Sequence, residues 1–400
     1  MAQGFSQTRL DRIPAFLQEK YLDSGRLPHA AIQVSRRGKL VLDSQLGEAR
    51  PGTPLPSDAI YRIASMTKPI TSVVFMMLVE EGKVALDDLL IKFCPEFEKT
   101  GVFVAGGGNM PFVTRTVQQH IRMRDLLTHR AGLSYSFQER HPVDAAYRKT
   151  KIDDFASNQT MDEFIANLAQ IPLLFNPGDH WNYSVATDVL GAVIERIEAK
   201  PFATVLQERL FDPLGMKDTG FHIAPDQQHR LTDAYAFHPR DKMVSFDSGD
   251  ASRWAKNRNF HSGGGGLLST MADYHRFCLM LLGGGTWDGQ HYLGRKSLEL
   301  MALNHLPGGG DLTEHSVGAF SEDDNAGIGF GLGFATTIAP ARAGVPSSVG
   351  DFYWGGMFST GFFVDPAEDI AMVFMTQLMP SSTYPVRREI KTMIYAALHD

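Results

Sequence analysis

The chain has 400 residues, of which 43% are hydrophobic and 21% charged, a composition typical of a folded globular protein rather than a disordered one. Its net charge of −7 argues against the broad basic surface that nucleic acid or anionic lipid would require. The longest apolar run, residues 73 to 79, is far shorter than the ~20 residues needed to cross a bilayer, so we expect no membrane span.

The N-terminal region starts with an amphipathic helical pattern and has no apolar signal core, which predicts a cytoplasmic protein. The chain has only two cysteines, Cys94 and Cys278, and no CxxC pair. We therefore expect two buried free thiols.

Strand patterns stand at both ends of the chain and helical patterns fill the middle. The expected elements are a hairpin of residues 30–35 and 40–43, a helix from Ile70 to Glu81 stopped by Gly82, helices at 161–171 and 186–198, a second hairpin of 359–364 and 370–375, and a final helix at 385–398. The fold class is thus α/β (α+β), with an antiparallel sheet flanked by helices. Residues 1–82 and 261–400 would form a discontinuous α/β domain, and residues 83–260 a mainly helical inserted lobe, with the site in a cleft between them.

A glycine-rich stretch at 261–266 lacks the glycine spacing and the Gly-Lys-Ser/Thr ending of a phosphate-binding loop. We interpret it as a flexible turn before a helix that Ser269 or Thr270 caps, with Asp273 in its first turn.

Ser65 and Lys68 are the pair of residues that indicates a catalytic site. Three residues apart at the start of a helix, they would share one face, and a buried lysine can become neutral enough to take a proton from a serine. A capping serine with a solvated lysine one turn later is the structural alternative, although the apolar approach at 59–64 favours burial of the lysine.

The segment Tyr61–Lys68 resembles the nucleophile motif of the serine β-lactamase and penicillin-binding-protein superfamily, and the segment 126–133 resembles a helix end and turn common in its class C branch. Four further segments resemble later signatures of that superfamily in the same order: 126–133, 175–184, 265–273 and 329–334. Five ordered matches span nearly the whole chain, so the resemblance is specific.

The resemblance implies a role for each matched residue. Ser65 would attack an acyl carbonyl, and Lys68 and Tyr183 would transfer protons, although the sequence does not decide which of the two is the general base. The backbone amides of Ser65 and Met357 would form the oxyanion hole.

Two positions depart from the lactamase pattern. Trp354 replaces the usual lysine of the third motif, Trp354-Gly355-Gly356, and Val185 replaces an asparagine two residues after the tyrosine. Both changes remove polar contacts with a substrate, so we expect an uncharged acyl substrate, as in the family VIII carboxylesterases that this pattern resembles. Residues expected to contact substrate are Trp354, Gly355, Gly356, Trp181, Val185, Tyr135 and Phe137, with core packing an equally good account of Tyr135 and Phe137.

The expected activity is hydrolysis of small, short-chain esters through an acyl-enzyme on Ser65, with a small-molecule ester as the partner. The alternatives are an acyltransferase with an alcohol acceptor, a weak β-lactamase or D-amino-acid peptidase, and a catalytically silent binding protein. The sequence has no Gly-x-Ser-x-Gly elbow and no His-x-x-x-His spacing, so we expect no α/β-hydrolase site, no metal and no cofactor. His129 is expected to tie down a turn rather than to act chemically.

Overall fold

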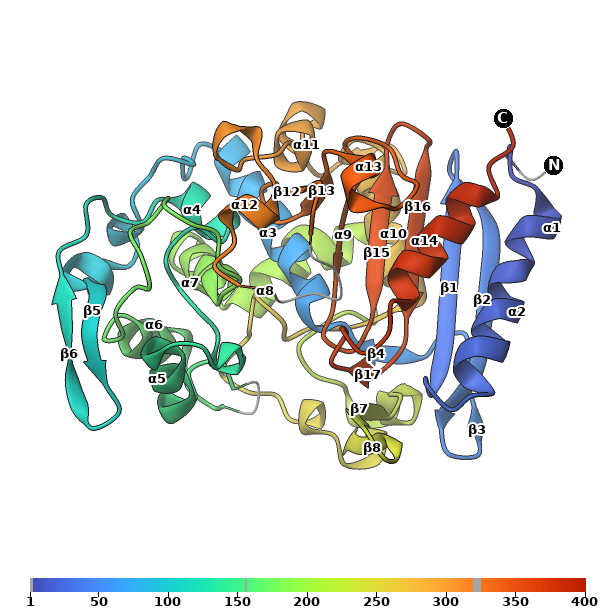
Figure 1. Ribbon diagram of the computed structural model, residues 1–400, viewed down its shortest axis with the longest axis horizontal. Helices are drawn as coiled ribbons and strands as arrows, with labels where there is room; N and C mark the ends of the chain where they lie inside the picture. The colour runs from blue at the N-terminus through green and yellow to red at the C-terminus, as the bar shows by residue number, and fades with distance from the viewer. Residues whose placement is uncertain (1–2, 155–156, 319–324) are drawn as a thin grey trace.

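The computed structural model describes residues 3–154, 157–318 and 325–400, and its centre is an antiparallel sheet built from both ends of the chain (Figure 1). The strand order is β12-β13-β14-β15-β16-β1-β2-β3, and every neighbouring pair is antiparallel. The strands are β1 His29–Arg36, β2 Lys39–Arg50, β3 Thr53–Pro54, β12 Ile328–Phe330, β13 Ala335–Thr337, β14 Phe352–Gly355, β15 Gly361–Asp365 and β16 Ile370–Met375. The predicted sheet and both predicted hairpins are confirmed.

Helices cover both faces of this sheet (Figure 1). Alternate residues of β16 explain why: Ile370, Met372 and Phe374 belong to one apolar cluster, while Ala371 and Val373 belong to the other. A strand buried on both sides reads as a continuous apolar run, as β16 does. The first face carries α1 Gln7–Leu10, α2 Arg12–Leu17 and α14 Val386–Ala396, and the second carries α3 Thr67–Glu80 and α10 Met271–Leu282.

The second hairpin begins later than its sequence pattern predicts. We expected a strand from Ser359, but β15 starts at Gly361. Ser359 has a φ of 66°, which belongs to a turn, and the Gly356 amide donates to the Thr360 carbonyl at 3.0 Å across that turn. The tight turn ends strand β14 next to the element that carries Ser65.

Helix α3 differs from the expected amphipathic helix in two respects. Its first residue is Thr67, and Ser65 lies just before it in a 3₁₀ turn, Ala64–Met66. Every residue from Thr67 to Leu78 is buried, so α3 runs through the core with no solvent-facing side over that length. Pro69 is tolerated because it lies in the first turn, where its missing N–H has no helical acceptor.

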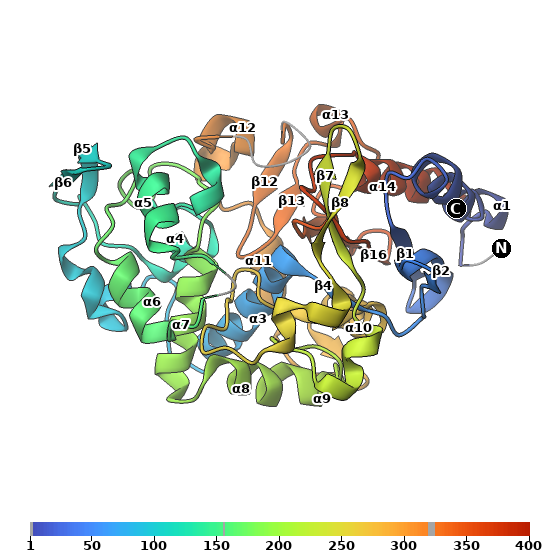
Figure 2. The ribbon, with the colours of Figure 1, turned by 90° about the horizontal axis from the view of Figure 1, so that it is seen from below.

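The mainly helical region includes α4 Met123–Leu127, α5 Pro142–Thr150, α6 Met161–Leu168, α7 Ala186–Glu198, α8 Phe202–Leu206 and α9 Asp212–Leu214, with a hairpin of β5 Val102–Gly107 and β6 Met110–Arg115 at its far end. A further hairpin, β7 Ala234–His238 and β8 Lys242–Asp247, lies away from α5 and α6 (Figure 2), because β7 pairs in parallel with β17 Leu378–Met379 near the end of the chain. The division into a domain of residues 1–82 and 261–400 and a lobe of residues 83–260 stays a prediction, and this hairpin is one part of the proposed lobe that pairs with the C-terminal region.

Small elements complete the described chain. The short strands are β4 Ile60–Arg62, β9 Leu268–Thr270, β10 Thr286–Trp287 and β11 Gln290–His291, and the remaining α-helices are α11 Arg295–Ala302, α12 Leu312–His315 and α13 Pro340–Ala343. Thr270 caps α10 by accepting the Asp273 amide, as the sequence predicted. Cys94 and Cys278 are buried and free, as predicted. None of the helices in the described part of the chain is long and apolar enough to cross a membrane.

The pairing of β4 with β9 holds the segment before Ser65, and a buried ion pair anchors it. The Arg62 side chain is fully buried, and its Nε donates to Asp247 Oδ2 at 2.8 Å. A buried guanidinium that loses its carboxylate keeps its desolvation cost without the compensating attraction.

Asp247→Asn should therefore lower the free energy of unfolding by about 3 kcal/mol, measured by urea denaturation. Asp250→Asn is the matched control, because Asp250 pairs with Arg50 but its side chain is 78% exposed, and it should cost less than about 1 kcal/mol. Equal effects of the two substitutions would contradict an anchoring role for the Arg62 pair.

Candidate active site

Ser65 and Lys68 meet at the N-terminal end of α3. The serine lies in the 3₁₀ turn and the lysine on the first helical turn, and Lys68 Nζ is 3.3 Å from Ser65 Oγ. The lysine side chain is 2% exposed, whereas Ser65 is partly exposed. The serine is thus open to a substrate while the amine beneath it is shielded from water.

Tyr183 reaches the same point from the loop before α7. Its hydroxyl donates to Ser65 Oγ at 2.6 Å, and Lys68 Nζ lies 4.5 Å from the centre of its ring. Burial raises the pKa of Tyr183 above its usual value, while its hydrogen bond with Ser65 and one with the Trp354 side chain act in the opposite direction. The phenol is therefore protonated at neutral pH and can serve as a proton donor.

The environment of Lys68 decides its charge. Besides Ser65, its Nζ donates to the Tyr135 hydroxyl at 2.9 Å and to the Gly264 carbonyl at 2.6 Å. Burial lowers the pKa of Lys68 to about 7, and the negative charge of Asp188 opposes that shift. A lysine with this pKa is neutral in a large share of molecules at neutral pH, so it can accept a proton.

Three residues that the sequence reasoning missed hold Lys68 in place. Asp188, on the first turn of α7, accepts from the Ser262 hydroxyl at 2.5 Å and from the Gly264 amide at 3.0 Å. These bonds fix the glycine-rich turn whose Gly264 carbonyl accepts from Lys68. The signal in the sequence was an acidic residue five positions after Tyr183, in the first turn of a predicted helix.

The glycine-rich stretch contains the expected turn, at residues 263–265, and this turn is packed inside the molecule rather than exposed. Residues 262–266 are buried, and a side chain at Gly264 would come within 2.4 Å of Asp188 Oδ2, while one at Gly263 would come within 2.7 Å of the Thr187 carbonyl. The glycines are there because the turn packs directly against α7.

Four of the side chains expected to contact substrate, at positions 135, 137, 181 and 185, lie in three different environments. Tyr135 is buried and accepts a hydrogen bond from Lys68, so it lies within the same cluster as Ser65, Lys68 and Tyr183. Phe137 is 59% exposed and stacks on Tyr135 with 4.9 Å between ring centres, which leaves its outer face for a ligand. Trp181 and Val185 have no exposed surface, and Trp181 stacks behind Tyr183 at 6.3 Å. Neither side chain is therefore exposed to a substrate, contrary to expectation, and Trp181 supports the tyrosine from the core.

The end of strand β14 lies beside Ser65. Trp354 packs against the ring of Tyr183 at 5.6 Å, and a side chain at Gly356 would come within 2.4 Å of the Ile63 carbonyl. Met357 packs against the small apolar cluster that contains Ala64. Glycine at 356 thus allows the backbone that carries the Met357 amide to approach the turn that carries Ser65.

His129 lies behind Tyr183, with 5.0 Å between the two rings. It has a φ of 55°, its carbonyl accepts from the Asn182 amide, and its Nδ1 is 3.2 Å from Ser184 Oγ. Burial holds the pKa of His129 well below its usual value, so the ring is neutral. These contacts join its turn to the segment that carries Tyr183.

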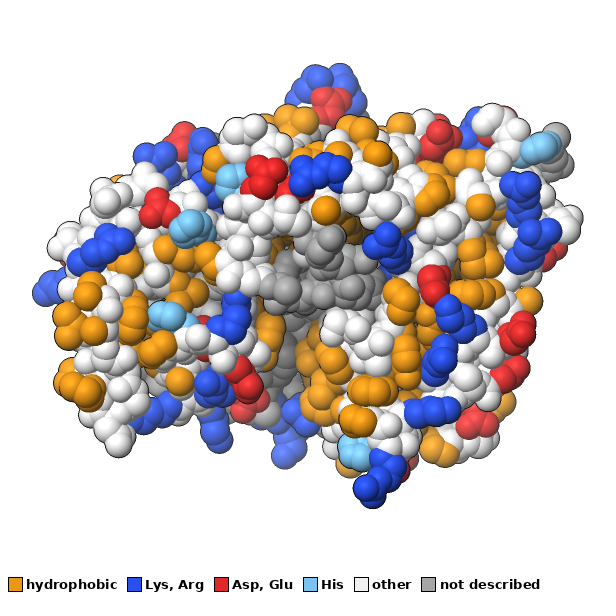
Figure 3. All heavy atoms as spheres, viewed as in Figure 1, with side chains coloured by type: hydrophobic (Ala, Val, Ile, Leu, Met, Phe, Trp, Pro, Cys, Tyr) orange, Lys and Arg blue, Asp and Glu red, His pale blue; other side chains and the backbone are white. Residues whose placement is uncertain are grey.

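On the face viewed in Figure 3, hydrophobic side chains lie on both the helical part and the sheet part of the molecule, among scattered Lys, Arg, Asp and Glu side chains. Within the residues that the structure describes, no three His, Cys, Asp or Glu side chains are grouped so that they could hold a metal ion.

Comparison with known proteins identifies the family. The profile described as beta-lactamase matches residues 16–395 of this chain. The chain belongs to the β-lactamase family. The architecture agrees, because the structure of EstCE1, described as a hydrolase with promiscuous acyltransferase activity, superimposes with a TM-score of 0.81 at 25% identity, covering 97% of this chain and 99% of EstCE1.

Two curated relatives are similar to this chain over most of its length. Protein Rv1367c of Mycobacterium tuberculosis is 36% identical over 90% of this chain and 88% of its own length. Esterase EstB of Burkholderia gladioli is 29% identical over 94% of this chain and 93% of its own length. Together with the family match, these similarities make the chain a serine hydrolase of the family VIII esterase type within the serine β-lactamase and penicillin-binding-protein superfamily.

Asp188 provides a test of the charge on Lys68. Its carboxylate raises the pKa of the lysine, so Asp188→Asn should lower that pKa below about 7. Protonated Lys68 cannot accept a proton, so kcat/KM falls as the pH drops through this pKa, and the acid limb of the profile should move to lower pH in the variant.

The measurement is kcat/KM for a nitrophenyl ester between about pH 5 and pH 9. Asparagine retains an oxygen that can accept from Ser262, so the turn is preserved. The control is Asp212→Asn on the exposed side of α9, which should leave the limb in place. If the acid limb of the kcat/KM profile stays at the same pH in Asp188→Asn, then Asp188 carries no negative charge beside Lys68.

Proposed function

We propose that this protein is a carboxylesterase that hydrolyses small, short-chain acyl esters through a covalent acyl-enzyme on Ser65. The observation that carries the proposal is the cluster in which Lys68 Nζ and the Tyr183 hydroxyl both lie within hydrogen-bond reach of Ser65 Oγ, at 3.3 and 2.6 Å. A nucleophile with a neutral amine on one side and a protonated phenol on the other has both partners that acyl transfer needs.

In acylation, Ser65 Oγ forms a bond to the ester carbonyl carbon and its proton passes to neutral Lys68. As the bond to the leaving alkoxide breaks, Tyr183 gives its proton to that oxygen, and the Lys68 ammonium then returns a proton to the Tyr183 oxygen. The products are an alcohol and an acyl-serine, with Lys68 neutral again. Water repeats the sequence, and the acid and Ser65 are released.

This assignment makes Lys68 the general base and Tyr183 the proton relay. The lowered pKa of Lys68 and the raised pKa of Tyr183 support it, because at neutral pH the first group can take a proton and the second still holds one. The opposite assignment would need a phenolate in a buried position, where desolvation disfavours the charge.

The tetrahedral oxyanion would accept from the backbone amides of Ser65 and Met357. The Ser65 amide lies at the N-terminal end of the segment that becomes α3, and the close approach of Gly356 to the Ile63 carbonyl brings the Met357 backbone toward it. Donors of this kind are most effective where water is excluded and charge develops.

The acyl group would be uncharged where it meets Tyr183. Trp354 occupies the position from which a lysine would pair with a carboxylate, and its ring packs against Tyr183. Phe137 would provide a second aromatic surface at the entrance, since it is 59% exposed and stacked on Tyr135. Flat apolar walls favour aliphatic or aromatic acyl chains over polar ones.

Ser65→Ala should reduce kcat/KM for a short-chain nitrophenyl ester by about 10⁴-fold or more, because no other group can form the acyl-enzyme. The matched control is Ser297→Ala on α11, which should retain full activity. Intact-protein mass spectrometry after brief exposure to substrate should detect an acyl adduct only when Ser65 is present. Full hydrolysis by Ser65→Ala would refute the proposal.

A second candidate is acyl transfer to an alcohol, favoured by the close structural likeness to EstCE1. The chemistry is the same until deacylation, where an alcohol replaces water as the nucleophile. Apolar surfaces at the entrance, such as Phe137, would hold an alcohol better than they hold water.

Adding a primary alcohol to the ester assay should therefore produce a new ester alongside the free acid, measured by chromatography of both products. Nitrophenol release should change little if acylation limits the rate, while the product ratio shifts with alcohol concentration. If the free acid is the sole product even at high alcohol concentration, the activity is hydrolysis and acyl transfer to alcohols is refuted.

A further inference from the structure

Two hydroxyl groups compete for the lone pair of neutral Lys68. A lysine ammonium has three N–H donors and no lone pair, so loss of a proton leaves the amine with two donors and one lone pair. Lys68 Nζ lies 3.3 Å from Ser65 Oγ, 2.9 Å from the Tyr135 hydroxyl and 2.6 Å from the Gly264 carbonyl. The ammonium can donate to all three oxygens, but the neutral amine can donate to only two of them. The direction of the lone pair therefore decides whether Lys68 can take the proton of Ser65.

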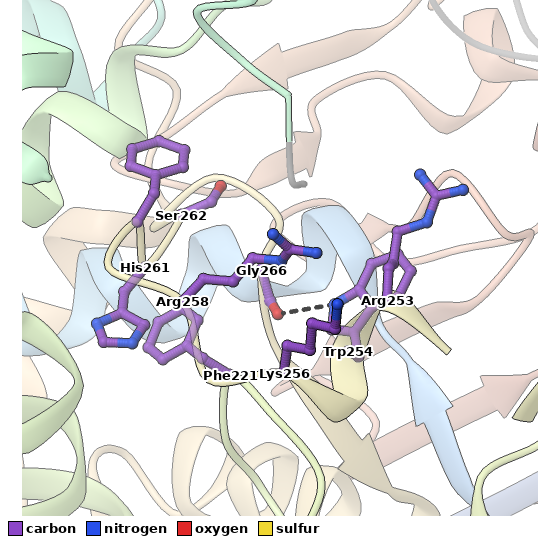
Figure 4. A pocket seen from close by; sticks show the side chains of 9 residues that line it. Phe221, Arg253, Trp254, Lys256, Arg258, His261, Ser262 and Gly266 are labelled. Atoms are coloured by element: carbon purple, nitrogen blue, oxygen red, sulfur yellow. Dashed lines mark hydrogen bonds between the residues drawn. The ribbon is translucent and has the colours of Figure 1, made fainter. Parts of the chain in front are cut away.

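The Gly264 carbonyl takes one of the two donors. A carbonyl oxygen can only accept, whatever the charge of the amine. The glycine-rich turn that carries it is held from two directions. The Gly264 amide donates to Asp188 at 3.0 Å, and the indole nitrogen of Trp254 donates to the Gly266 carbonyl at 3.3 Å, a bond drawn as a dashed line in Figure 4. One N–H and the lone pair are therefore left for Ser65 and Tyr135.

Tyr183 sets the direction of the Ser65 hydroxyl. The Tyr183 hydroxyl donates to Ser65 Oγ at 2.6 Å, so Ser65 accepts there and keeps its own hydrogen for another partner. In the described part of the chain that partner is Lys68 Nζ, at 3.3 Å. Ser65 can donate to Lys68 only if the lone pair of the amine faces it. Tyr135 must then accept the second N–H.

The packing of Tyr135 holds its oxygen at Lys68. The Tyr135 ring packs against the rings of Phe137 and Tyr183, with 4.9 and 5.2 Å between ring centres. Its hydroxyl occupies space that a side chain at position 264 would need, because a Cβ at Gly264 would lie 2.9 Å from it. The hydroxyl therefore stays beside the amine.

Tyr135 is a neutral phenol, which can accept through its oxygen. Burial holds the pKa of Tyr135 well above its usual value, and the acidic groups that face it act in the same direction: Asp188, Tyr183, Asp153 and Tyr147. His129, also near Lys68, is held neutral by burial. Asp188 is thus the one neighbour whose charge raises the pKa of Lys68, and Tyr135 acts on the amine as a dipole.

We propose that Tyr135 is a positioning residue for the general base: its oxygen accepts one N–H of neutral Lys68 and so turns the lone pair of the amine toward Ser65. The inference rests on the proposed function, in which Lys68 takes the serine proton. When that proton moves from Ser65 Oγ to Nζ, the bonds from Nζ to Tyr135 and Gly264 stay as they are, so the amine need not rotate. In the opposite arrangement the Tyr135 hydroxyl donates to the lone pair, and Ser65 has no acceptor for its proton.

Tyr135→Phe removes the hydroxyl and keeps the ring. The plateau of kcat/KM for a short-chain nitrophenyl ester should fall about tenfold, because the amine is no longer held with its lone pair toward Ser65. The acid limb of the profile should move to lower pH, because the Lys68 ammonium loses an acceptor that stabilises it and its pKa falls. Both effects are measured between about pH 5 and pH 9.

Tyr147→Phe is the matched control. Tyr147 lies on α5 and is 1% exposed, and its hydroxyl accepts from the backbone amide of Ser134, the residue before Tyr135, at 3.2 Å. This variant removes a buried hydroxyl beside the same loop but none that contacts Lys68. Its plateau should stay within about twofold of the wild-type value, and its acid limb should not move.

The direction of the shift separates the two arrangements. If Tyr135 donates to Lys68, its hydroxyl stabilises the neutral amine, so Tyr135→Phe would raise the plateau and move the acid limb to higher pH. That result would overturn the proposal. An acid limb that stays in place would also overturn it, because a residue that only packs against its neighbours does not change the pKa of Lys68.

A second measurement follows Lys68 without turnover. In protein labelled with carbon-13 lysine, the Cε resonance of Lys68 is identified by its absence in Lys68→Met, and it should titrate at lower pH in Tyr135→Phe than in the wild type. If no ester is hydrolysed but this titration shifts as expected, the esterase proposal fails and the contact between Tyr135 and Lys68 stands. If hydrolysis depends on Ser65 but the titration does not shift, the role of Tyr135 is overturned and the esterase proposal stands.

Discussion

The removal of the Lys68 side chain from water is the constraint on which the site depends. Burial of the ammonium costs free energy, and the structure offsets this cost with three acceptors, Ser65, Tyr135 and the Gly264 carbonyl. The acceptors come from three separate parts of the chain, so Lys68 is buried and hydrogen-bonded in this way only when these parts have assembled. In the proposed mechanism, folding and activation of Ser65 are therefore one event.

Asp188 links this requirement to the packing of the helical region. Its bonds to Ser262 and Gly264 press the glycine-rich turn against α7, and its charge limits how far the pKa of Lys68 falls. A neutral residue at 188 would let burial lower the pKa of the amine further, and a solvated acid would not hold the turn. One buried carboxylate therefore sets both the position of the glycine-rich turn and the protonation state of Lys68.

Local patterns predicted the sheet, the hairpins and the Ser65, Lys68 and Tyr183 cluster, because each of these depends on short spacings or on a motif. Tyr135 was placed near the site, but its bond to Lys68 could not be foreseen, since it joins residues 67 positions apart in the chain. Gly264 contributes a carbonyl, which has no side-chain signature at all. The start of β15 was misplaced because residues 359 and 360 have strand-like neighbours but a turn conformation. Contacts made by the backbone and contacts between distant segments therefore could not be predicted from the sequence.

The uncharged side chain at position 354 is consistent with the same balance. A carboxylate next to Ser65 would stabilise the Lys68 ammonium and so withhold the base, an effect that the charge of Asp188 already exerts in part. Replacement of the lysine at 354 by tryptophan removes the group that would attract such a carboxylate.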